Sequence, residues 1–382
     1  MHGIKTMLKT STSLTPATVA TSVIGLVVTA PDADEAMFPL DTPVLISNVI
    51  TALAKSGTAG PTNTLRPALT AIANIVSPNI VVVRVAVDAA NQDAKVLGTN
   101  GPAYSGMQAL LMAEAKTGSR PRILGAPGLD TLAVTNGLVA VAKRLRGMVY
   151  AMAEGDTRDE AISYREEFGE RELMLLWPAT SLGHADTIGC AVGMRAYIDQ
   201  TVGWHKTLSN VVVNGITGTA ADVSWVMDDD TTDAALLNAA GITTIICHDG
   251  WRFWGNETTS SVDSWKFESA VRTSQVLQDT IQKAHFPYVD SPLTVGMVKA
   301  LIAKGNAFIR KCVINGQMIG GNFYYNTALN ATGELASGDL TLSYDFTPCA
   351  PLQSLTEVQT ITDTYYSDFA SQLAATTTAV AA

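Results

Sequence analysis

Cys247, His248 and Asp249 follow one another directly and carry the three groups of a nucleophilic triad: a thiol, an imidazole and a carboxylate. In an extended segment, adjacent side chains point to opposite faces, so this thiol and imidazole could not exchange a proton. A thiolate nucleophile needs its base within hydrogen-bond distance. We therefore predict no catalytic residue here, and we do not expect the chain to be an enzyme.

The other reactive side chains show no metal-binding or nucleotide-binding spacing. The histidines are never three or four residues apart, so they form no local ligand pair. They are His2, His184, His205, His248 and His285. The acidic run Asp228–Asp230 lacks the spaced ligands and the glycine of an EF-hand loop, which favours a solvated loop. The sequence has no GxxxxGK(S/T), no GxGxxG after a strand, no HExxH and no GxSxG. We expect no metal and no cofactor, although a metal site assembled from distant residues stays open.

Two segments concentrate tryptophan beside basic side chains: GWHKTLSN (203–210) and DGWRFWGN (249–256). Such a cluster could hold a ligand by stacking or by cation–π contact with its arginine or lysine. It could also be a core or interface cluster, because a tryptophan buries a large area and has one polar N–H. The structural interpretation is favoured.

The composition predicts that much apolar surface is hidden, in a large core or against copies of the same chain. Apolar residues make up 47% of the 382 residues and charged residues only 16%, and a chain of this length suits two domains. The net charge of −10 argues against nucleic acid as a main partner, because phosphate binding needs clustered Lys and Arg.

Cysteine usage and hydropathy predict the compartment. The four cysteines are scattered without a CxxC pair, so neither a zinc site nor a disulfide framework is expected, and free thiols fit a reducing cytoplasm. No apolar run reaches about 18 residues, so we predict no membrane insertion. A secretory signal is not expected either, because the Thr/Ser-rich stretch 10–21 separates Lys5 and Lys9 from the apolar stretch 23–30.

Both ends of the chain show strand-like patterns without an obvious local partner. Residues 4–9 alternate between Ile4, Thr6, Leu8 and Lys5, Met7, Lys9. Residues 1–20 therefore resemble a detached arm, because an isolated strand must pair with a sheet edge elsewhere. A disordered terminus is the alternative. At the other end, Thr376, Thr377, Thr378 and Val380 form a β-branched, polar stretch that also predicts a strand. The last basic residue is Lys311, and six acidic residues follow it.

Between the arms, strand-like and helix-like stretches alternate, which favours an α/β layer. The predicted strands are 23–29, 80–86, 122–126, 173–177 and 211–213. The predicted helices are 49–54, 65–75, 105–116 and 131–144.

The last third predicts two long helices, 264–285 and 294–311, then strands at 323–325 and 340–346. On the second helix, an apolar face opposes a basic face that carries Lys299, Lys304, Arg310 and Lys311. Residues 355–361 are expected to be extended. Asp363 is a predicted N-cap for a short helix whose Tyr366, Phe369 and Leu373 share a face.

Several long stretches of unusual composition resemble the tail sheath proteins of contractile phages. The likeness is closest to sheaths of temperate myophages with straight contractile tails and of R-type pyocins. It covers most of the chain in order. The stretches are HGI (2–4), FPLDTPVLISNV (38–49), RPRILGAPGLD (120–130), RELMLLWP (171–178), GWHKTLSNVVVNGITG (203–218), GITTIICHDGWRFWGN (241–256) and SYDFTPCAPLQSLTEVQTITDTYY (343–366). Residues 87–103 and 312–338 are less similar, and the final helix has Thr and Ala where the family carries more charge.

The resemblance implies a polymer of six-fold rings stacked helically around a rigid inner tube. It implies a two-domain α+β fold, in which a tube-facing core domain is built from both terminal regions and an α/β domain is inserted. It implies that terminal arms join the sheets of neighbouring subunits. Contraction, triggered by the baseplate, would drive the tube through a target envelope without nucleotide hydrolysis.

On this basis we expect an exchange arm at 1–20, an outward α/β domain at 21–257 and a core domain at 258–382 with its own arm at about 355–382. The arm-exchange residues are Ile4–Lys9 together with Thr376–Thr378 and Val380, and the basic face of 294–311 is the candidate tube contact. Expected partners are copies of the chain, the tube protein, and baseplate and tail terminator proteins. The expected location is a virion tail or tail-like particle assembled in the bacterial cytoplasm.

Two other functions remain at this point. The layered middle region is compatible with an α/β hydrolase, which would need a pocket where a nucleophile contacts a base. Another tail polymer, such as the tube protein, is the second alternative, but the length and helix content argue against it.

Overall fold

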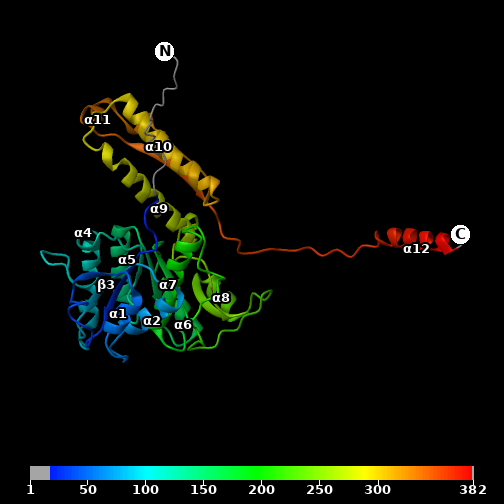
Figure 1. The fold of residues 1–382 in the computed structure, drawn as a ribbon, viewed down its shortest axis with the longest axis horizontal. Helices are drawn as coiled ribbons and strands as arrows, with labels where there is room; N and C mark the ends of the chain where they lie inside the picture. The colour runs from blue at the N-terminus through cyan, green and yellow to red at the C-terminus, as the bar shows by residue number, and fades with distance from the viewer. Residues whose placement is uncertain (1–17, 381–382) are drawn as a thin grey trace, which may run out of the picture. The chain divides into compact units, whose positions relative to one another are not determined.

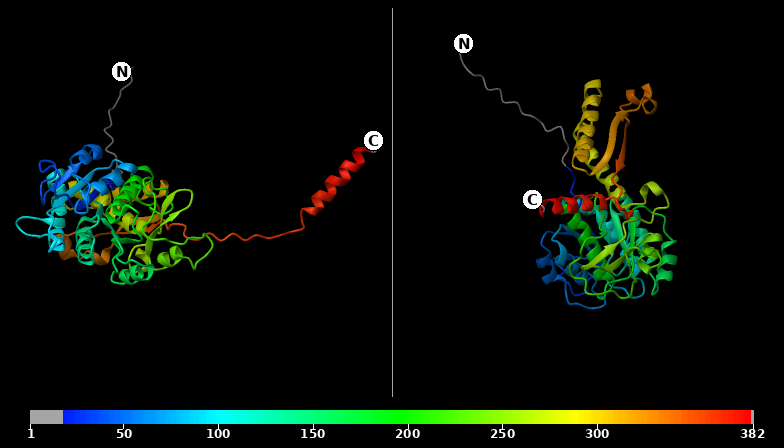
Figure 2. Two further views of the ribbon diagram at one scale, coloured as in Figure 1. Left: turned by 90° about the horizontal axis from the view of Figure 1, so that it is seen from below. Right: turned by 90° about the vertical axis from the view of Figure 1, so that its right-hand side faces the viewer.

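The computed structural model describes residues 18–380, and its largest element is an eight-stranded sheet with helices on both faces (Figures 1 and 2). The chain divides after Pro351 into two compact units. The predicted strand Ile4–Lys9 lies outside the described residues. The predicted combination of a layered α/β region with further helices and strands is confirmed.

The sheet has the order β2-β3-β1-β4-β5-β6-β7-β8. Its strands are β1 (Ile24–Thr29), β2 (Pro43–Ile46), β3 (Ile80–Val85), β4 (Ile123–Gly125), β5 (Met148–Met152), β6 (Leu173–Leu176), β7 (Ile242–Cys247) and β8 (Trp251–Trp254). The six inner strands run parallel, and the edge strands β2 and β8 are antiparallel to their neighbours. Inner strands with both faces covered are apolar throughout, which explains runs such as IVVVRV in β3.

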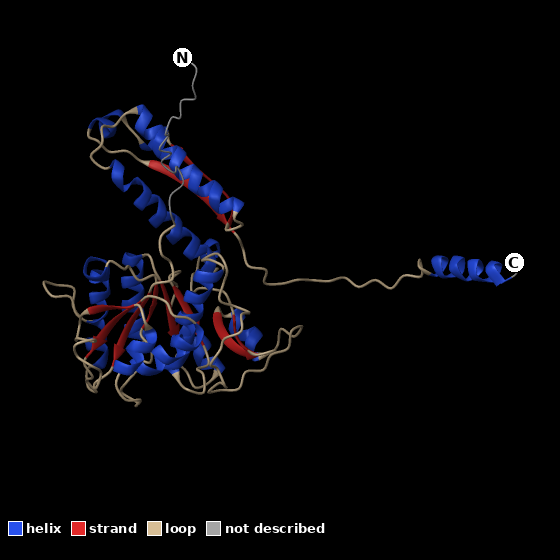
Figure 3. Cartoon of the chain, viewed as in Figure 1, coloured by secondary structure: helices blue, strands red, loops and turns tan. Residues whose placement is uncertain are grey.

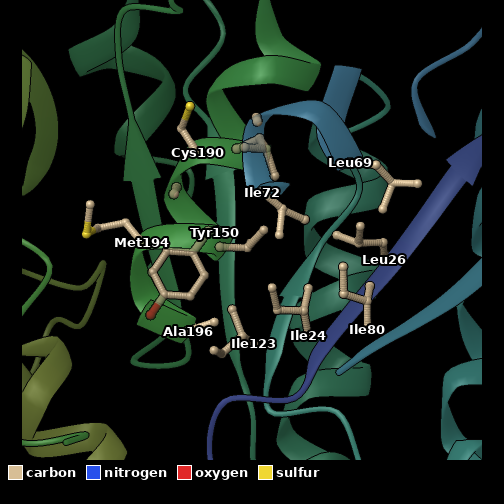
Figure 4. Close-up of a cluster of buried hydrophobic side chains, with 14 of the residues drawn as sticks. Ile24, Leu26, Leu69, Ile72, Ile80, Ile123, Tyr150, Cys190, Met194 and Ala196 are labelled. Carbon is tan, nitrogen blue, oxygen red and sulfur yellow. The ribbon is translucent and has the colours of Figure 1, made fainter. Parts of the chain in front are cut away.

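Helices cover the two faces of the sheet. One face packs against α1 (Val49–Lys55), α2 (Leu65–Ile75) and α7 (His184–Thr201). The other packs against the 3₁₀ helix η1 and five α-helices, which are η1 (Gly106–Met112), α3 (Gln92–Leu97), α4 (Ala113–Thr117), α5 (Leu132–Leu145), α6 (Arg158–Arg165) and α8 (Asp233–Ala239). Because strand side chains alternate, β1 sends Ile24 and Leu26 to the α2–α7 face and Val27 to the other. Figure 4 shows the α2–α7 face, where Leu69, Ile72 and Met194 pack on the strands.

Helix α7 was not predicted from the sequence. Twelve of its eighteen residues are buried, so it has no polar stripe to reveal a helical period. The strand predicted at 211–213 is also wrong, because this segment forms only an isolated bridge between Val212 and Arg252. It lies along the outer edge of β8, where Asn210 N–H donates to Phe253 O at 2.8 Å and Val213 N–H to Trp251 O at 2.8 Å. The segment therefore covers an edge that could otherwise pair with another chain.

A second hydrophobic core lies among α9 (Glu268–His285), α10 (Val295–Ile314), β9 (Met318–Tyr325) and β10 (Leu342–Pro348). Strands β9 and β10 form a separate antiparallel pair, and the short helix α11 (Thr332–Ala336) lies in the connection between them (Figure 3). The predicted helix at 264–285 begins later, because Asp263–Trp265 forms a 3₁₀ turn first. The two long helices and the two strands of this region are confirmed.

In the C-terminal unit, residues 352–362 form no helix and no strand, and α12 (Tyr366–Val380) follows. The strand predicted from Thr376, Thr377, Thr378 and Val380 is therefore wrong, since these residues belong to the last turns of α12. Alanines surround them at 374, 375 and 379, and alanine is the strongest helix former, so the helix wins over the β preference of threonine.

Candidate functional site: assembly surfaces and the ionic joint at α9

The segment 352–362 exposes apolar side chains that a monomer would be expected to hide. Leu352, Leu355, Val358 and Ile361 are 78%, 70%, 88% and 96% exposed. The segment is extended, yet none of its residues belongs to a strand among the described residues. A backbone of this kind, with apolar and β-branched side chains, has the properties of a strand that completes a sheet on another molecule.

Strands β9 and β10 form a sheet small enough to accept further strands. The register pairs Phe323 with Tyr344 and Gly321 with Phe346. Within the described chain the sheet has two strands and therefore two outer edges. On the β9 edge, the Asn306 amide of α10 accepts from Phe323 N–H at 2.9 Å and donates to Phe323 O at 2.7 Å, as a neighbouring strand would. Just before β10, the Asn330 amide makes the same two contacts with Thr341, accepting from its N–H at 2.8 Å and donating to its O at 2.9 Å. Within Leu342–Pro348 no described side chain does so, which leaves β10 itself the more accessible edge.

The structure separates the four basic candidates of α10. Lys299, Arg310 and Lys311 are exposed and form no ion pair with any described residue. Lys304 is half-buried: its ammonium donates to Ala284 O at 3.1 Å and lies 5.1 Å from the centre of the Tyr288 ring. Lys304 therefore joins α10 to the end of α9. Lys299 and Arg310, about three turns apart, share the face away from the buried residues Leu301 and Phe308.

Four charged side chains form a fully buried network between α7 and α9. Arg195 contacts Asp199 at 2.7 Å and Glu268 at 3.1 Å, and Arg272 pairs with Asp199. The Tyr150 hydroxyl of β5 donates to Glu268 at 2.7 Å. None of the four charged side chains is more than 2% exposed. Two cations and two anions balance, so the cluster fixes where α9 crosses the sheet domain.

The pKa directions in this network follow from burial and pairing. Burial alone would lower the pKa of Arg195, but the Glu268 and Asp199 carboxylates reverse the effect and raise it. Burial, and then the charge of Glu268, raise the pKa of Tyr150 well above its usual value, so its hydroxyl remains a donor. Removing one partner of such a buried network typically costs about 3–5 kcal/mol.

Arg195 also links the network to the second core. Its guanidinium donates to Lys206 O at 2.7 Å and to Gly203 O at 3.3 Å. Between these residues, Trp204 is 6% exposed and packs with Leu277 and Phe308. One of the predicted tryptophan segments is therefore a structural joint. In the other tryptophan segment, the ring centre of Trp254 lies 5.6 Å from that of Trp225.

A second ionic contact holds the far half of α9. Asp279 pairs with Arg122 at 2.5 Å and with Arg146 at 2.7 Å. Gln275 donates to Gly147 O at 2.8 Å. These contacts join α9 to the starts of β4 and β5. Sequence reasoning missed both networks, although the spacing of Arg195 to Asp199 and of Glu268 to Arg272, four residues apart in apolar helices, was a usable signal.

The side chains considered for catalysis do not assemble. Cys247 is exposed, and the His248 ring lies beside Trp225, at 5.0 Å between ring centres. Ser209 Oγ accepts from Gly255 N–H at 3.1 Å. Burial lowers the pKa of His205, whose Nδ1 has no partner among the described residues. Within residues 18–380, these four side chains give no nucleophile hydrogen-bonded to a base.

The same part of the chain, residues 18–380, shows neither a metal site nor a helix that could span a membrane. Among the residues the structure describes, no group of three or more His, Cys, Asp or Glu could hold a metal ion. In the acidic run, Asp229 accepts from Thr231 N–H at 2.8 Å, which makes a local turn. None of the described helices has the length and hydropathy needed to cross a bilayer.

Comparison with known proteins gives consistent relatives. Residues 102–259 match the family model of the phage tail sheath protein central domain. The tail sheath protein of Escherichia phage P2 is 41% identical over 385 residues, covering 95% of this chain and 96% of the relative. The major tail sheath protein of Serratia phage KSP20 is 42% identical over 381 residues, covering 96% of each.

Solved structures with a similar fold are also sheaths. The helical sheath of the anti-feeding prophage in its contracted state has a TM-score of 0.70 at 16% identity, covering 94% of this chain and 98% of that chain. The sheath complex of an extracellular contractile injection system, also contracted, has a TM-score of 0.70 at 15% identity, covering 96% and 98%. At this identity the likeness concerns the fold.

Proposed function

The chain belongs to the phage tail sheath protein family, and from this premise we propose how it works as the structural subunit of a contractile sheath. Copies form six-fold rings that stack helically around an inner tube. A signal from the baseplate makes the stack shorten and drives the tube through a target envelope. The observation that carries the proposal is the exposed apolar segment 352–362, which belongs to no helix and no strand of the described chain.

The first step is donation of this segment to the β9–β10 sheet of another copy. Alternate residues would contribute main-chain hydrogen bonds, and Val358 and Ile361, three residues apart, would cover opposite faces of the extended sheet. We place the donated strand at 352–362 and not at Thr376–Val380, because the latter residues are helical. The predicted C-terminal arm at about 355–382 is kept, with a strand followed by a helix.

The N-terminal arm adds a second strand in this proposal. Residues 4–9 alternate and carry Lys5 and Lys9, and the C-terminal unit is acidic. Opposite charges on adjacent strands contribute about 0.2–1 kcal/mol per pair, which favours one register over its alternatives. Each copy would then be tied to neighbours through both ends.

The tube contact is assigned to α10. Lys299, Arg310 and Lys311 are exposed, and solvated ion pairs are weak enough to separate when the sheath expands. In this arrangement the region 258–382, together with residues 1–20, faces the tube, and the α/β region 21–257 lies outward. The networks at α9 would make the two regions of one copy move together.

The relatives support a baseplate as a partner and a tail as the location. A baseplate of the anti-feeding prophage contains a chain with this fold, at 17% identity and a TM-score of 0.69, which supports contact with a baseplate. Terminator and tube proteins complete the proposed set. The subunit would assemble in the bacterial cytoplasm into a virion tail or tail-like particle, and contraction would need no nucleotide hydrolysis and no catalytic residue.

Electron microscopy of the purified chain tests the proposal. Full-length protein should form long tubular polymers in negative stain. Deletion of residues 352–382 should abolish these polymers. It should leave a soluble monomer with an unchanged urea midpoint, because the remaining unit, which ends at Pro351, is compact without the deleted one. Deletion of residues 1–10 should also prevent polymers. Normal polymers from either deletion variant would refute arm exchange, and a strictly monomeric full-length chain at high concentration would refute the sheath assembly.

A further inference from the structure

A cavity of about 430 Å³ lies where strands β1, β3 and β4 begin. Arg120 and Arg122 line it from the loop before β4, and Lys283 and Phe286 line it from the end of α9 and the turn that follows. Ligand crevices of open parallel sheets lie at the carboxyl ends of the strands. This cavity is at the opposite edge, so its position favours a contact between chains over a small-molecule site.

Two arginines that line the cavity, one buried and one partly exposed, have a hydrogen-bond donor that the described chain leaves unused. Arg122 is 7% exposed and pairs with Asp279 at 2.5 Å, but its Nε–H has no partner among the described residues. The Nε–H of Arg120 is also buried without a described partner. Buried donors are normally satisfied, so the described chain does not saturate these guanidinium groups.

The charge of the cavity is not fully balanced. Burial lowers the pKa of Arg122 to about 10 although Asp279 opposes the shift. The Glu114 carboxylate is 62% exposed and 3.8 Å from Arg120, which is a loose contact. Lys283 is exposed and forms no ion pair with a described residue. The lining holds three cationic groups and the two carboxylates of Asp279 and Glu114, so one positive charge is left in excess for an entering carboxylate.

The mouth of the cavity also has an apolar part. The Phe286 side chain is 75% exposed. A suitable occupant therefore combines a carboxylate with an aromatic or aliphatic side chain.

We propose that the cavity binds residues 363–369 from the C-terminal unit of a second copy. This segment, DTYYSDF, carries Asp363 and Asp368 beside Tyr365, Tyr366 and Phe369, which are 74%, 74% and 61% exposed. No basic residue occurs after Lys311, so nothing in the segment repels the arginines. The inference rests on the proposed exchange of C-terminal arms and adds the place where the arm ends.

The N-terminal residues 1–17 are the competing occupant, because Val19 and Ala20 line the same cavity. Their only charged side chains are Lys5 and Lys9. Cations would be repelled by Arg120, Arg122 and Lys283. Charge complementarity therefore favours the acidic segment.

Disulfide trapping tests the contact. In full-length chain with Cys247→Ser and Cys349→Ser, we combine Lys283→Cys with Asp363→Cys or, separately, with Asp368→Cys. Mild oxidation of assembled polymers should give a ladder of cross-linked chains on a non-reducing gel with at least one pair. The control replaces Lys283→Cys by Lys116→Cys, an exposed position nearby that does not line the cavity, and should give no ladder.

Each outcome decides the inference. If polymers form but the gel shows only the monomer band with both cysteine pairs, the docking site is wrong and the sheath assembly is unaffected. A ladder or cross-link between Lys283→Cys and Lys5→Cys in place of the expected pairs would assign the cavity to the N-terminal segment and overturn it as well. Absence of polymers would remove the sheath proposal and this inference with it.

A charge swap gives an independent measurement. Lys283→Glu should raise the critical concentration for polymer formation about threefold to fivefold, the effect of a partly exposed ion pair. Adding Asp368→Lys should restore it, and Lys116→Glu alone should leave it unchanged. If Lys283→Glu and Lys116→Glu behave alike, or the second change gives no rescue, the specific contact is wrong.

Discussion

At the residue scale, buried charged side chains hold the elements of this chain together. Four of its buried charged side chains, Arg195, Asp199, Glu268 and Arg272, neutralise one another and are enclosed by helices and strands. The reactive-looking trio at 247–249 is exposed: His248 Nε2 lies 3.9 Å from the Asp249 carboxylate, and no hydrogen bond among the described residues joins His248 to Cys247. Buried ion pairs add little net stability but are costly to break, so their effect is to hold α9 in one position.

Glu268→Ala should lower the free energy of unfolding of the monomer by about 3–5 kcal/mol, because Arg195 and Arg272 lose a carboxylate in a fully buried environment. Urea denaturation measures this. The matched control is Glu167→Ala, an exposed site that should change stability by less than about 0.5 kcal/mol. Equal effects of the two substitutions would show that the network does not hold α9.

Asp130 predicts a pH dependence. Burial raises its pKa to about 6, although its carboxylate accepts from Met152 N–H at 2.6 Å. The folded state therefore binds the proton more tightly than the unfolded state, and the resulting stability is present below pH 4 and lost as pH rises through 6. Asp130→Asn removes this loss. The free energy of unfolding of the variant minus that of the parent should therefore increase by about 3 kcal/mol between pH 4 and pH values above 7. A difference between the two chains that does not change from pH 4 to pH 8 would contradict it.

At the scale of elements, α10 and the β9–β10 pair depend on one close approach. A Cβ added at Gly305 would lie 2.7 Å from the Phe323 ring, whereas the nearest atom to one added at Gly296 is 4.0 Å away. The Phe323 ring also stacks on the Tyr344 ring of β10, with 5.7 Å between ring centres, so a displacement of Phe323 would also displace β10. The proposed acceptor sheet is therefore positioned by a glycine on the helix behind it.

Gly305→Ala should destabilise the monomer by about 1–3 kcal/mol and reduce polymer formation, because overpacking moves β9. Gly296→Ala on the same helix should stabilise it by up to about 1 kcal/mol, since alanine is the better helix former. Thermal unfolding and negative-stain counts measure both. If Gly305→Ala changes neither monomer stability nor polymer formation, α10 and the β9–β10 pair do not depend on this close approach.

Lys299→Glu combined with Arg310→Glu should reduce the fraction of sheathed tubes when tube protein is added, because an exposed basic face becomes acidic. Polymerisation of the chain alone should not change. Lys143→Glu with Arg144→Glu in α5 gives the same change of charge elsewhere on the exposed surface. An unchanged yield of sheathed tubes would remove α10 as the tube contact.

At the scale of the whole molecule, the chain is a folded unit with a C-terminal unit that exposes its apolar side chains. Such exposure is unfavourable in a free monomer and is relieved in a polymer. Stability of the monomer and strength of the assembly should therefore respond to different residues.

Val358→Asp with Ile361→Asp should leave the urea midpoint of the monomer unchanged, because the two side chains are 88% and 96% exposed. The same variant should lose polymer formation, because it places charge in the proposed donated strand. Thr356→Asp with Thr360→Asp adds equal charge to the same segment without removing apolar contact and should retain more polymer. Sedimentation of the assembled fraction compares them, and equal loss in both would attribute the effect to charge alone.

The sequence by itself determined the alternating α/β layer, the two long helices of the last third and the family. The hydrophobic period and the composition of a segment are enough to predict a helix that has one apolar face, as in α2 and α10. The resemblance depended on long stretches such as 203–218 and 241–256. The absence of a local catalytic motif also followed from residue spacing alone.

Only the tertiary structure decided the elements whose surroundings override local preference. Helix α7 is buried on nearly all sides and shows no period, and the threonines at 376–378 follow a helix nucleated upstream. The ionic joint at α9 could not be foreseen because its contacts between α7 and α9 join residues that are 73 apart in the sequence. The cavity at Arg120 and Arg122 is equally non-local, since it requires three strand ends and the last turns of α9 to meet. Burial and long-range pairing depend on the whole fold, and no window of sequence contains them.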